Sequence, residues 1–144
     1  MVVKTVTVPS REGYQQEIMA GSHTFMSDLP ISEGGNETAP EPYDLLLAAL
    51  GACTSMTLRM YAERKGWNLE DIRVELSIHK SPGEKDVIHK KIEVTGDLTE
   101  DQIERLRYIA TRCPVNLTLR RGVEMEEEIQ LASTYQATTN IPRD

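Results

Sequence analysis

Aromatic residues and cysteine are scarce in this chain of 144 residues. Aromatic side chains make up 5% of it, with a single Trp and a single Phe, and there are only two cysteines. A core built from such a composition must consist mainly of Leu, Ile, Val and Met. Without an apolar leader, two cysteines indicate a reducing cytosol, where a disulfide between them is usually transient and catalytic rather than structural.

Three further features are missing. Residues 1–16 contain no apolar segment of the kind found in a signal peptide. No run approaches the roughly 18 apolar residues of a membrane span. Positive charge is not in excess either, because the formal net charge is −7, and nucleic-acid binding needs clustered Lys and Arg. We therefore expect a cytoplasmic protein whose main partner is neither nucleic acid nor a membrane.

The pattern of apolar residues predicts one α+β domain over residues 1–131 and a loose tail over 132–144. Antiparallel strands are expected early in the chain, in a central hairpin and at the end of the domain. The long helix should begin near Pro42 and end at Gly66, and a second helix should be capped by Thr99 and Gln102. The expected strands are 3–8, 14–21, 23–29, 72–80, 87–96 and 123–131, and the expected helices are 42–65, 98–113 and a short turn after Pro114.

The central hairpin carries one exception to its own pattern. Ile88, Ile92 and Val94 lie on one face of the expected strand 87–96, and Lys90 interrupts that apolar series. In the same hairpin His79 and His89 can be cross-strand neighbours, but no set of Cys, His and carboxylates has the spacing of a zinc site. We therefore expect no metal and no cofactor.

The two cysteines permit two interpretations. Cys53 lies in the middle of the apolar helix, where free cysteine is usually a small buried hydrophobe. A reactive thiolate there would need a cation from elsewhere in the fold, because the helix dipole fades after the first turn. Cys113 stands just before Pro114, at a helix break that could place its thiol near free backbone N–H groups. Taken alone, each residue remains ambiguous.

The helix "PYDLLLAALGACTSMTLRMYAERKG" and the later "CPV", together with the strand order, resemble the osmotically induced protein C and organic hydroperoxide resistance (OsmC/Ohr) family. The resemblance covers nearly the whole chain apart from the tail and points to a divergent OsmC-like branch. It implies an OsmC-like fold in which two chains form an intertwined homodimer, with the long helices buried between two sheets. It also implies a thiol peroxidase with Cys53 as the peroxidatic and Cys113 as the resolving cysteine.

The same resemblance suggests an arginine and a carboxylate near the thiol. Arg11, in "SREG", occupies a place comparable to the family's arginine. The family's glutamate precedes the cysteine by ten residues, and Tyr43 stands there instead. Asp44 and Glu41 are the candidate carboxylates, although nine residues of regular helix would put Asp44 on the face opposite Cys53.

Organic hydroperoxides are the substrates that the resemblance implies, with Tyr43, Leu50 and Met56 expected to bind them. A dithiol, such as a lipoylated protein, would be the reductant. The alternative is a non-catalytic dimeric module that binds an apolar small molecule or senses oxidation. A third interpretation, a structural dimer with inert thiols, also fits the residues.

Overall fold

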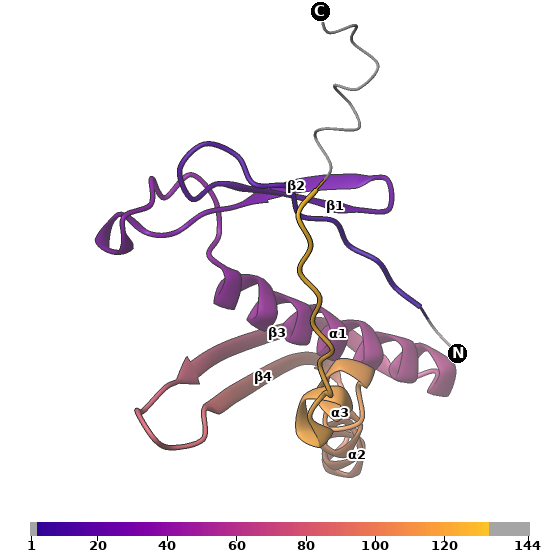
Figure 1. Cartoon of the computed structure of the whole chain (residues 1–144). Coiled ribbons are helices and arrows are strands. Elements are labelled where there is room, and N and C mark those ends of the chain that lie inside the picture. The colour runs from indigo at the N-terminus through magenta and orange to yellow at the C-terminus, as the bar shows by residue number, and fades with distance from the viewer. Residues whose placement is uncertain (1–2, 133–144) are drawn as a thin grey trace, which may run out of the picture.

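The computed structural model describes residues 3–132 and shows an α+β fold, as the sequence predicts. Two separate antiparallel hairpins lie on either side of one long helix (Figure 1). The elements, in chain order, are β1 (Gln16–Ala20), β2 (His23–Ser27), the 3-10 turn η1 (Ile31–Glu33), α1 (Pro42–Lys65), β3 (Asn68–His79), β4 (Val87–Asp97), α2 (Glu100–Ala110) and α3 (Pro114–Arg121).

The N-terminal hairpin is smaller than expected. β1 and β2 pair in register from Gln16–Ser27 to Ala20–His23, but the strand predicted over 3–8 does not form. Within it only Thr7 forms an isolated bridge to β1, with Met19, and beyond it Ser10 forms another, with Gln16. Alternating polarity can place a segment beside a sheet, yet a continuous ladder also needs matching backbone geometry, and Pro9 cannot donate a hydrogen bond.

The loop between β2 and α1 is organised by the buried carboxylate of Asp28. Its oxygens accept hydrogen bonds from the backbone N–H groups of Leu29, Asn36 and Thr38 and from the Thr38 hydroxyl, at 2.7–3.3 Å. The hydrogen bond from the Thr38 side chain is the main cause that lowers the pKa of Asp28, and the backbone donors act in the same direction. This carboxylate therefore fixes the approach of the chain to α1.

Helix α1 has the predicted bounds. Pro42 occupies its first turn, and Gly66 ends it in the left-handed conformation with φ of 69°. Every fourth residue from Leu50 to Ala62, together with Gly51, lies on the buried face. This face packs on β3, α2 and α3. Met56 and Met60 on other faces are exposed, so much of this apolar helix has no cover within the chain.

The length and composition of α1 would also allow a membrane span, which the sequence analysis did not expect. An 18-residue window has mean hydropathy 1.3, and 22% of it is buried within the described chain. A single helix of this kind is weak support for a span, because the core helices of globular proteins have the same character. The contacts of α1 with β3, α2 and α3 give its apolar face another explanation.

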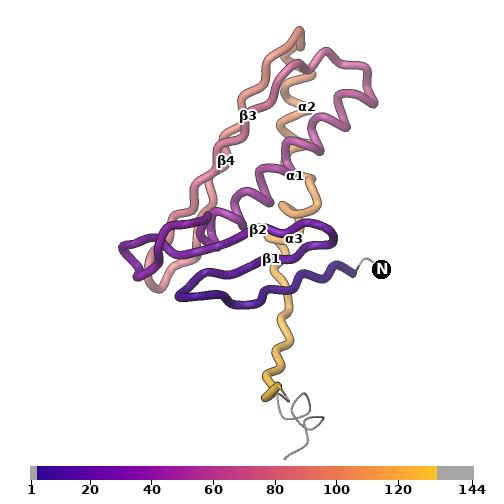
Figure 2. Tube along the Cα trace, turned by 90° about the horizontal axis from the view of Figure 1, so that it is seen from above, coloured from indigo at the N-terminus to yellow at the C-terminus, as the bar shows by residue number. Residues whose placement is uncertain are grey.

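The central hairpin β3–β4 runs alongside α1 (Figure 2), and β3 packs on this helix. Cross-strand pairs such as Ile72–Val94 and Val74–Ile92 confirm the predicted alternation, and the next pair in this series is Leu76–Lys90. A register shift between Leu69 and Asp71 bends the start of β3. The small core centres on Leu58, Leu106 and Ala110, with Tyr61, Trp67, Ile72, Ile92, Leu98 and Ile109 packed around them.

Helices α2 and α3 close the described fold. Thr99 and Gln102 form the predicted capping box of α2, and Gly122 ends α3. The strand predicted over 123–131 is wrong for the described chain, because this segment is extended, exposed and paired with no strand of residues 3–132. Figure 2 shows it running away from the hairpins and α1. The predicted tail lies, apart from residue 132, outside the described residues.

Candidate functional site

Cys53 lies on the flank of α1, between the buried face and the open face. Its side chain is half-buried and free. The next residue, Thr54, points fully into the core, with 0% of its surface exposed, and its hydroxyl lies 2.9 Å from the carbonyl oxygen of Leu50 one turn earlier. A polar side chain at this depth needs partners, and the partners of Thr54 come from other elements.

Cys113 is brought to this position from a distant part of the chain. It precedes the first residue of α3 as its N-cap, is 0% exposed, and is also free. Its sulfur lies 3.5 Å from the Thr54 hydroxyl oxygen. Thus the fold brings the second cysteine into contact with Thr54, the residue that follows Cys53 in α1.

Lys90 joins the same cluster from β4, and the sequence analysis did not assign it a role. Its ammonium donates hydrogen bonds to Thr54 Oγ1 at 2.9 Å, to the Ala110 carbonyl at 3.0 Å and to Asn116 Oδ1 at 3.2 Å. Burial lowers the pKa of Lys90. Its interruption of the apolar series on β4 was the one sequence signal that could have identified it.

Arg11 has a carboxylate partner, but it is not one of the two candidates. The guanidinium binds the Glu17 carboxylate on β1, with 2.7 Å between Nε and Oε2. Asp44 instead accepts a hydrogen bond from the backbone N–H of Glu41 at 3.1 Å, which caps the start of α1. Sequence spacing pointed to the region before Cys53, whereas Glu17 follows Arg11 across a turn that leads into β1.

The three residues expected to bind substrate do not share one pocket. Tyr43 is exposed at the start of α1, where its hydroxyl accepts a hydrogen bond from Lys80 at 2.9 Å. The hydrogen bond from Lys80 to Asp86 is the main cause that raises the pKa of Lys80, and the hydrogen bond to Tyr43 adds to it. Leu50 is buried, while Met56 is 64% exposed. Their role in substrate binding stays a prediction.

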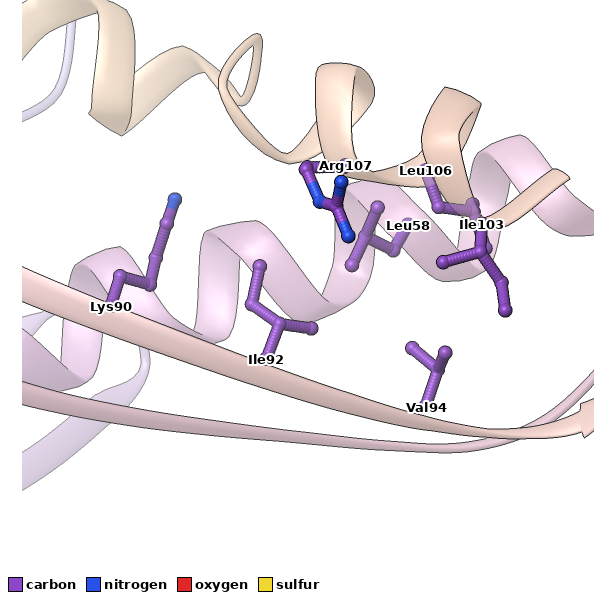
Figure 3. A pocket seen from close by; sticks show the side chains of 7 residues that line it. All are labelled: Leu58, Lys90, Ile92, Val94, Ile103, Leu106 and Arg107. Atoms are coloured by element: carbon purple, nitrogen blue, oxygen red, sulfur yellow. The ribbon is translucent and has the colours of Figure 1, made fainter. Parts of the chain in front are cut away.

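A cavity of about 290 Å³ lies beside the cysteine cluster, between α1, α2 and β4. Aliphatic side chains form most of its wall, and Lys90 and Arg107 add positive charge (Figure 3). Lys90 belongs to both the cavity and the cysteine cluster. The cavity is lined by Leu58, Lys90, Ile92, Val94, Ile103, Leu106 and Arg107.

Residues 3–132 contain no cluster of three or more Cys, His, Asp or Glu side chains that could hold a metal ion. His79 and His89 are neighbours, with ring centroids 4.8 Å apart, but no third ligand joins them.

Comparison with known proteins identifies relatives of this fold. The family model described as OsmC-like protein matches residues 34–128, which span both cysteines and Lys90. A comparison with curated proteins finds no significant match.

Solved structures with the same fold include three bacterial proteins. An OsmC-like protein from Mycoplasma pneumoniae has a TM-score of 0.73 and 18% identity, over 83% of this chain and 88% of that one. An organic hydroperoxide resistance protein OsmC from Legionella pneumophila has a TM-score of 0.63 and 22% identity, over 83% and 92%. The organic hydroperoxide resistance protein OhrB of Bacillus subtilis has a TM-score of 0.56 and 24% identity, over 82% and 91%. At these identities the likeness shows the fold alone.

Proposed function

This chain belongs to the OsmC-like protein family, and from that premise we propose that it is a thiol peroxidase that reduces organic hydroperoxides. Cys53 is the attacking thiol and Cys113 the resolving thiol. The observation that carries the proposal is the contact of Cys113 Sγ with Thr54 Oγ1 at 3.5 Å, directly beside Cys53. The two hydroperoxide resistance proteins with this fold support the choice of substrate class.

The reaction begins at Cys53, the more accessible of the two sulfurs. Its thiolate attacks the outer oxygen of a hydroperoxide, the O–O bond breaks, and the alkoxide leaves and takes up a proton to become an alcohol. Cys53 is then a sulfenic acid. Cys113 attacks that sulfur, a disulfide forms, and hydroxide leaves as water after protonation. An external dithiol, such as a lipoylated protein, reopens the disulfide by exchange.

Arg11 and Glu17 are proposed to assist the first step. Arg11 is the cation that stabilises the Cys53 thiolate, and Glu17, which binds the guanidinium, holds it in position. Glu17 thus has the role, orienting Arg11, that was expected from the sequence for Asp44 or Glu41. The Asp44 carboxylate is occupied at the start of α1, where it accepts from the backbone N–H of Glu41.

The functional unit is proposed to be a homodimer. Met56 and Met60 leave the outer face of α1 apolar and exposed, and each hairpin in the described chain has only two strands. The extended segment 123–131 exposes apolar side chains that alternate with acidic ones. A second copy can cover α1 and supply strands to the open sheet edges. We place this dimer in the cytoplasm.

Consumption of cumene hydroperoxide in the presence of a dithiol tests the activity. The wild-type protein should turn over, Cys53→Ser should abolish consumption, and Ser55→Ala, at a neighbouring position of α1, should retain it. Cys113→Ser should complete one turnover and then accumulate Cys53 sulfinic acid, visible by mass spectrometry. Peroxide consumption that survives Cys53→Ser would refute the assignment.

The cavity favours a second candidate function, a module that binds an apolar small molecule without turning it over. Its volume of about 290 Å³ and its aliphatic wall suit a short acyl chain. Titration of the reduced protein with a fluorescent fatty-acid probe tests this alternative. Binding that Ile92→Trp abolishes, in a protein that consumes no peroxide, would favour the module over the enzyme.

A further inference from the structure

Lys90 is the feature of the described chain that the peroxidase proposal leaves unexplained. It stands where the alternation of β4 requires an apolar residue, facing the core between Ile88 and Ile92. Burying an ammonium group is costly unless it is paired. All three of its N–H donors are used, but their acceptors, on Thr54, Ala110 and Asn116, are neutral oxygens. Hydrogen bonding is therefore satisfied while the charge is not compensated.

The charged groups that act on Lys90 come from three sides. From α3 and its N-cap, Arg120 disfavours the ammonium form and Cys113 favours it, and Cys53 on α1 favours it more weakly. Arg107 of α2 lines the same cavity. On β4 itself His89 and Lys91 point to the opposite face, because side chains alternate along a strand. Within residues 3–132 no carboxylate is among the groups that act on it.

The cysteines are the groups of residues 3–132 from which negative charge would act on Lys90. Burial is the largest influence on Lys90 and lowers its pKa, and a thiolate at Cys113 is the strongest influence that opposes it. Electrostatic coupling is reciprocal, so a cation that is stabilised by a thiolate stabilises that thiolate equally. With Cys113 neutral, the half-buried ammonium of Lys90 would lose the strongest of the charges that favour it.

Thr54 connects the lysine to the sulfur. Its hydroxyl oxygen accepts from Lys90 and lies 2.9 Å from the Leu50 carbonyl and 3.5 Å from Cys113 Sγ. The hydroxyl has one proton to donate, so it can serve either the carbonyl or the sulfur. A thiolate is the better acceptor of the two because it is charged. When its O–H bond rotates toward the sulfur, Thr54 donates to Cys113 while it accepts from Lys90. Two consecutive hydrogen bonds then connect the ammonium group to the thiolate.

We propose that Lys90, acting through Thr54, holds Cys113 as a thiolate in the reduced protein, so that Cys113 is ready to attack Cys53 once that residue is oxidised. The attack step rests on the proposed function, whereas the charge state does not. In that step the Cys113 thiolate forms the S–S bond to the Cys53 sulfenic acid, the S–O bond breaks, and hydroxide leaves and becomes water on protonation. Lys90 and Thr54 are positioning residues for this reaction.

The charge state can be measured without peroxide. In the reduced Cys53→Ser protein, Cys113 is the only thiol, and its ultraviolet thiolate absorbance is followed against pH, with the double variant lacking both cysteines as the blank. The expected result is a thiolate band at neutral pH. Lys90→Met should lower the ratio of thiolate to thiol about tenfold, the factor that corresponds to about 1.4 kcal/mol. Lys90→Arg should restore the band, and Lys91→Met, on the other strand face, should leave it unchanged.

Thr54 provides a second variant if Lys90→Met fails to fold by circular dichroism. Thr54→Val should weaken the band, and Thr54→Ser, which keeps the hydroxyl, should preserve it. Absence of the band from the Cys53→Ser protein at neutral pH, or an unchanged band in a folded Lys90→Met or Thr54→Val variant, overturns the inference. If the Cys53→Ser protein shows the band and responds to Lys90→Met as expected, but the wild-type protein consumes no peroxide, the proposed function alone is refuted.

Discussion

At the scale of single residues, the ion pair of Arg11 with Glu17 leads to a prediction about peroxide reactivity. Glu17→Gln removes the charge that orients Arg11 and should slow the reaction of Cys53 with cumene hydroperoxide about tenfold, as expected when a positioning group is lost. The free energy of unfolding should change little, because Arg11 is exposed. Single-turnover kinetics measure the rate.

The neighbouring Glu12 supplies the matched control, since it lies in the same turn and is exposed. Glu12→Gln should react at the wild-type rate. A Glu17→Gln protein that reacts as fast as the Glu12→Gln control would remove Glu17 from the site.

Asp28 leads to a residue-scale prediction about acid stability. Its hydrogen bonds lower its pKa in the folded state, so the stability that it contributes is complete above its unfolded pKa of about 3.9 and is lost as the pH falls through the folded value. Asp28→Asn should therefore lower the melting temperature at neutral pH, and the difference from wild type should shrink at strongly acidic pH. Asp71→Asn, exposed on β3, is the control for a simple loss of charge. A constant difference at all pH values would contradict this account.

The residues of the site were only partly predictable from the sequence. Cys53 and Cys113 stood out because they are the only thiols and because their local motifs resemble a known family. The inward-facing position of Lys90 was visible as a break in alternation, but its partners on α1 and α3 depend on how the helices pack on β4. Glu17 could not be found by spacing from Cys53, because its relation to Arg11 is set by a turn.

At the scale of elements, local signals decided which predictions were correct. Helices α1 and α2 carry their own start and stop residues, Pro42, Gly66 and the Thr99–Gln102 box, so their bounds follow from the sequence. In the hairpin β3–β4 apolar and polar side chains alternate, and the two strands pair with each other. In residues 3–8 and 123–131 apolar and polar side chains also alternate. Such a pattern shows that a strand would have one apolar face, but it does not supply a partner strand. These segments therefore form no full ladder in the described chain.

The bend of the central hairpin gives an element-scale prediction. Gly96 has φ of 146°, and a Cβ there would lie 2.1 Å from the carbonyl oxygen of Asn68. Gly96→Ala should lower the free energy of unfolding by about 2–4 kcal/mol, because backbone rather than a mobile side chain must shift. Urea denaturation measures the change.

Gly83, at the tip of the same hairpin, is the control. It also has positive φ, but nothing lies within 4 Å of an added Cβ. Gly83→Ala should therefore cost only the conformational strain, about 1 kcal/mol. Equal losses at the two positions would show that the close approach of Asn68 is not the cause.

At the scale of the whole molecule, the described chain leaves several surfaces uncovered in a way that an isolated globular domain does not. Its long helix is apolar beyond the face that packs on β3, α2 and α3, and its two sheets have two strands each. The extended segment 123–131 exposes Ile129 at 99%. Large exposed apolar surfaces of this kind mark interaction sites. These three features have one common explanation in the proposed homodimer.

Substitutions on the two faces of the extended segment 123–131 test the dimer, because only the apolar face is expected to contact the second copy. Val123, Met125, Ile129 and Leu131 share one face, which Glu127 interrupts, while Glu124, Glu126 and Glu128 share the opposite face. The wild-type protein should have twice the chain mass of 16.2 kDa in light scattering. Met125→Lys combined with Ile129→Lys should shift it to the monomer mass, because two charges would be buried without partners. The matched pair Glu126→Lys and Glu128→Lys changes more charge but leaves the apolar face intact, and should remain dimeric. A monomeric wild-type protein, or a dimer that the first pair leaves intact, would show that this face does not join two copies.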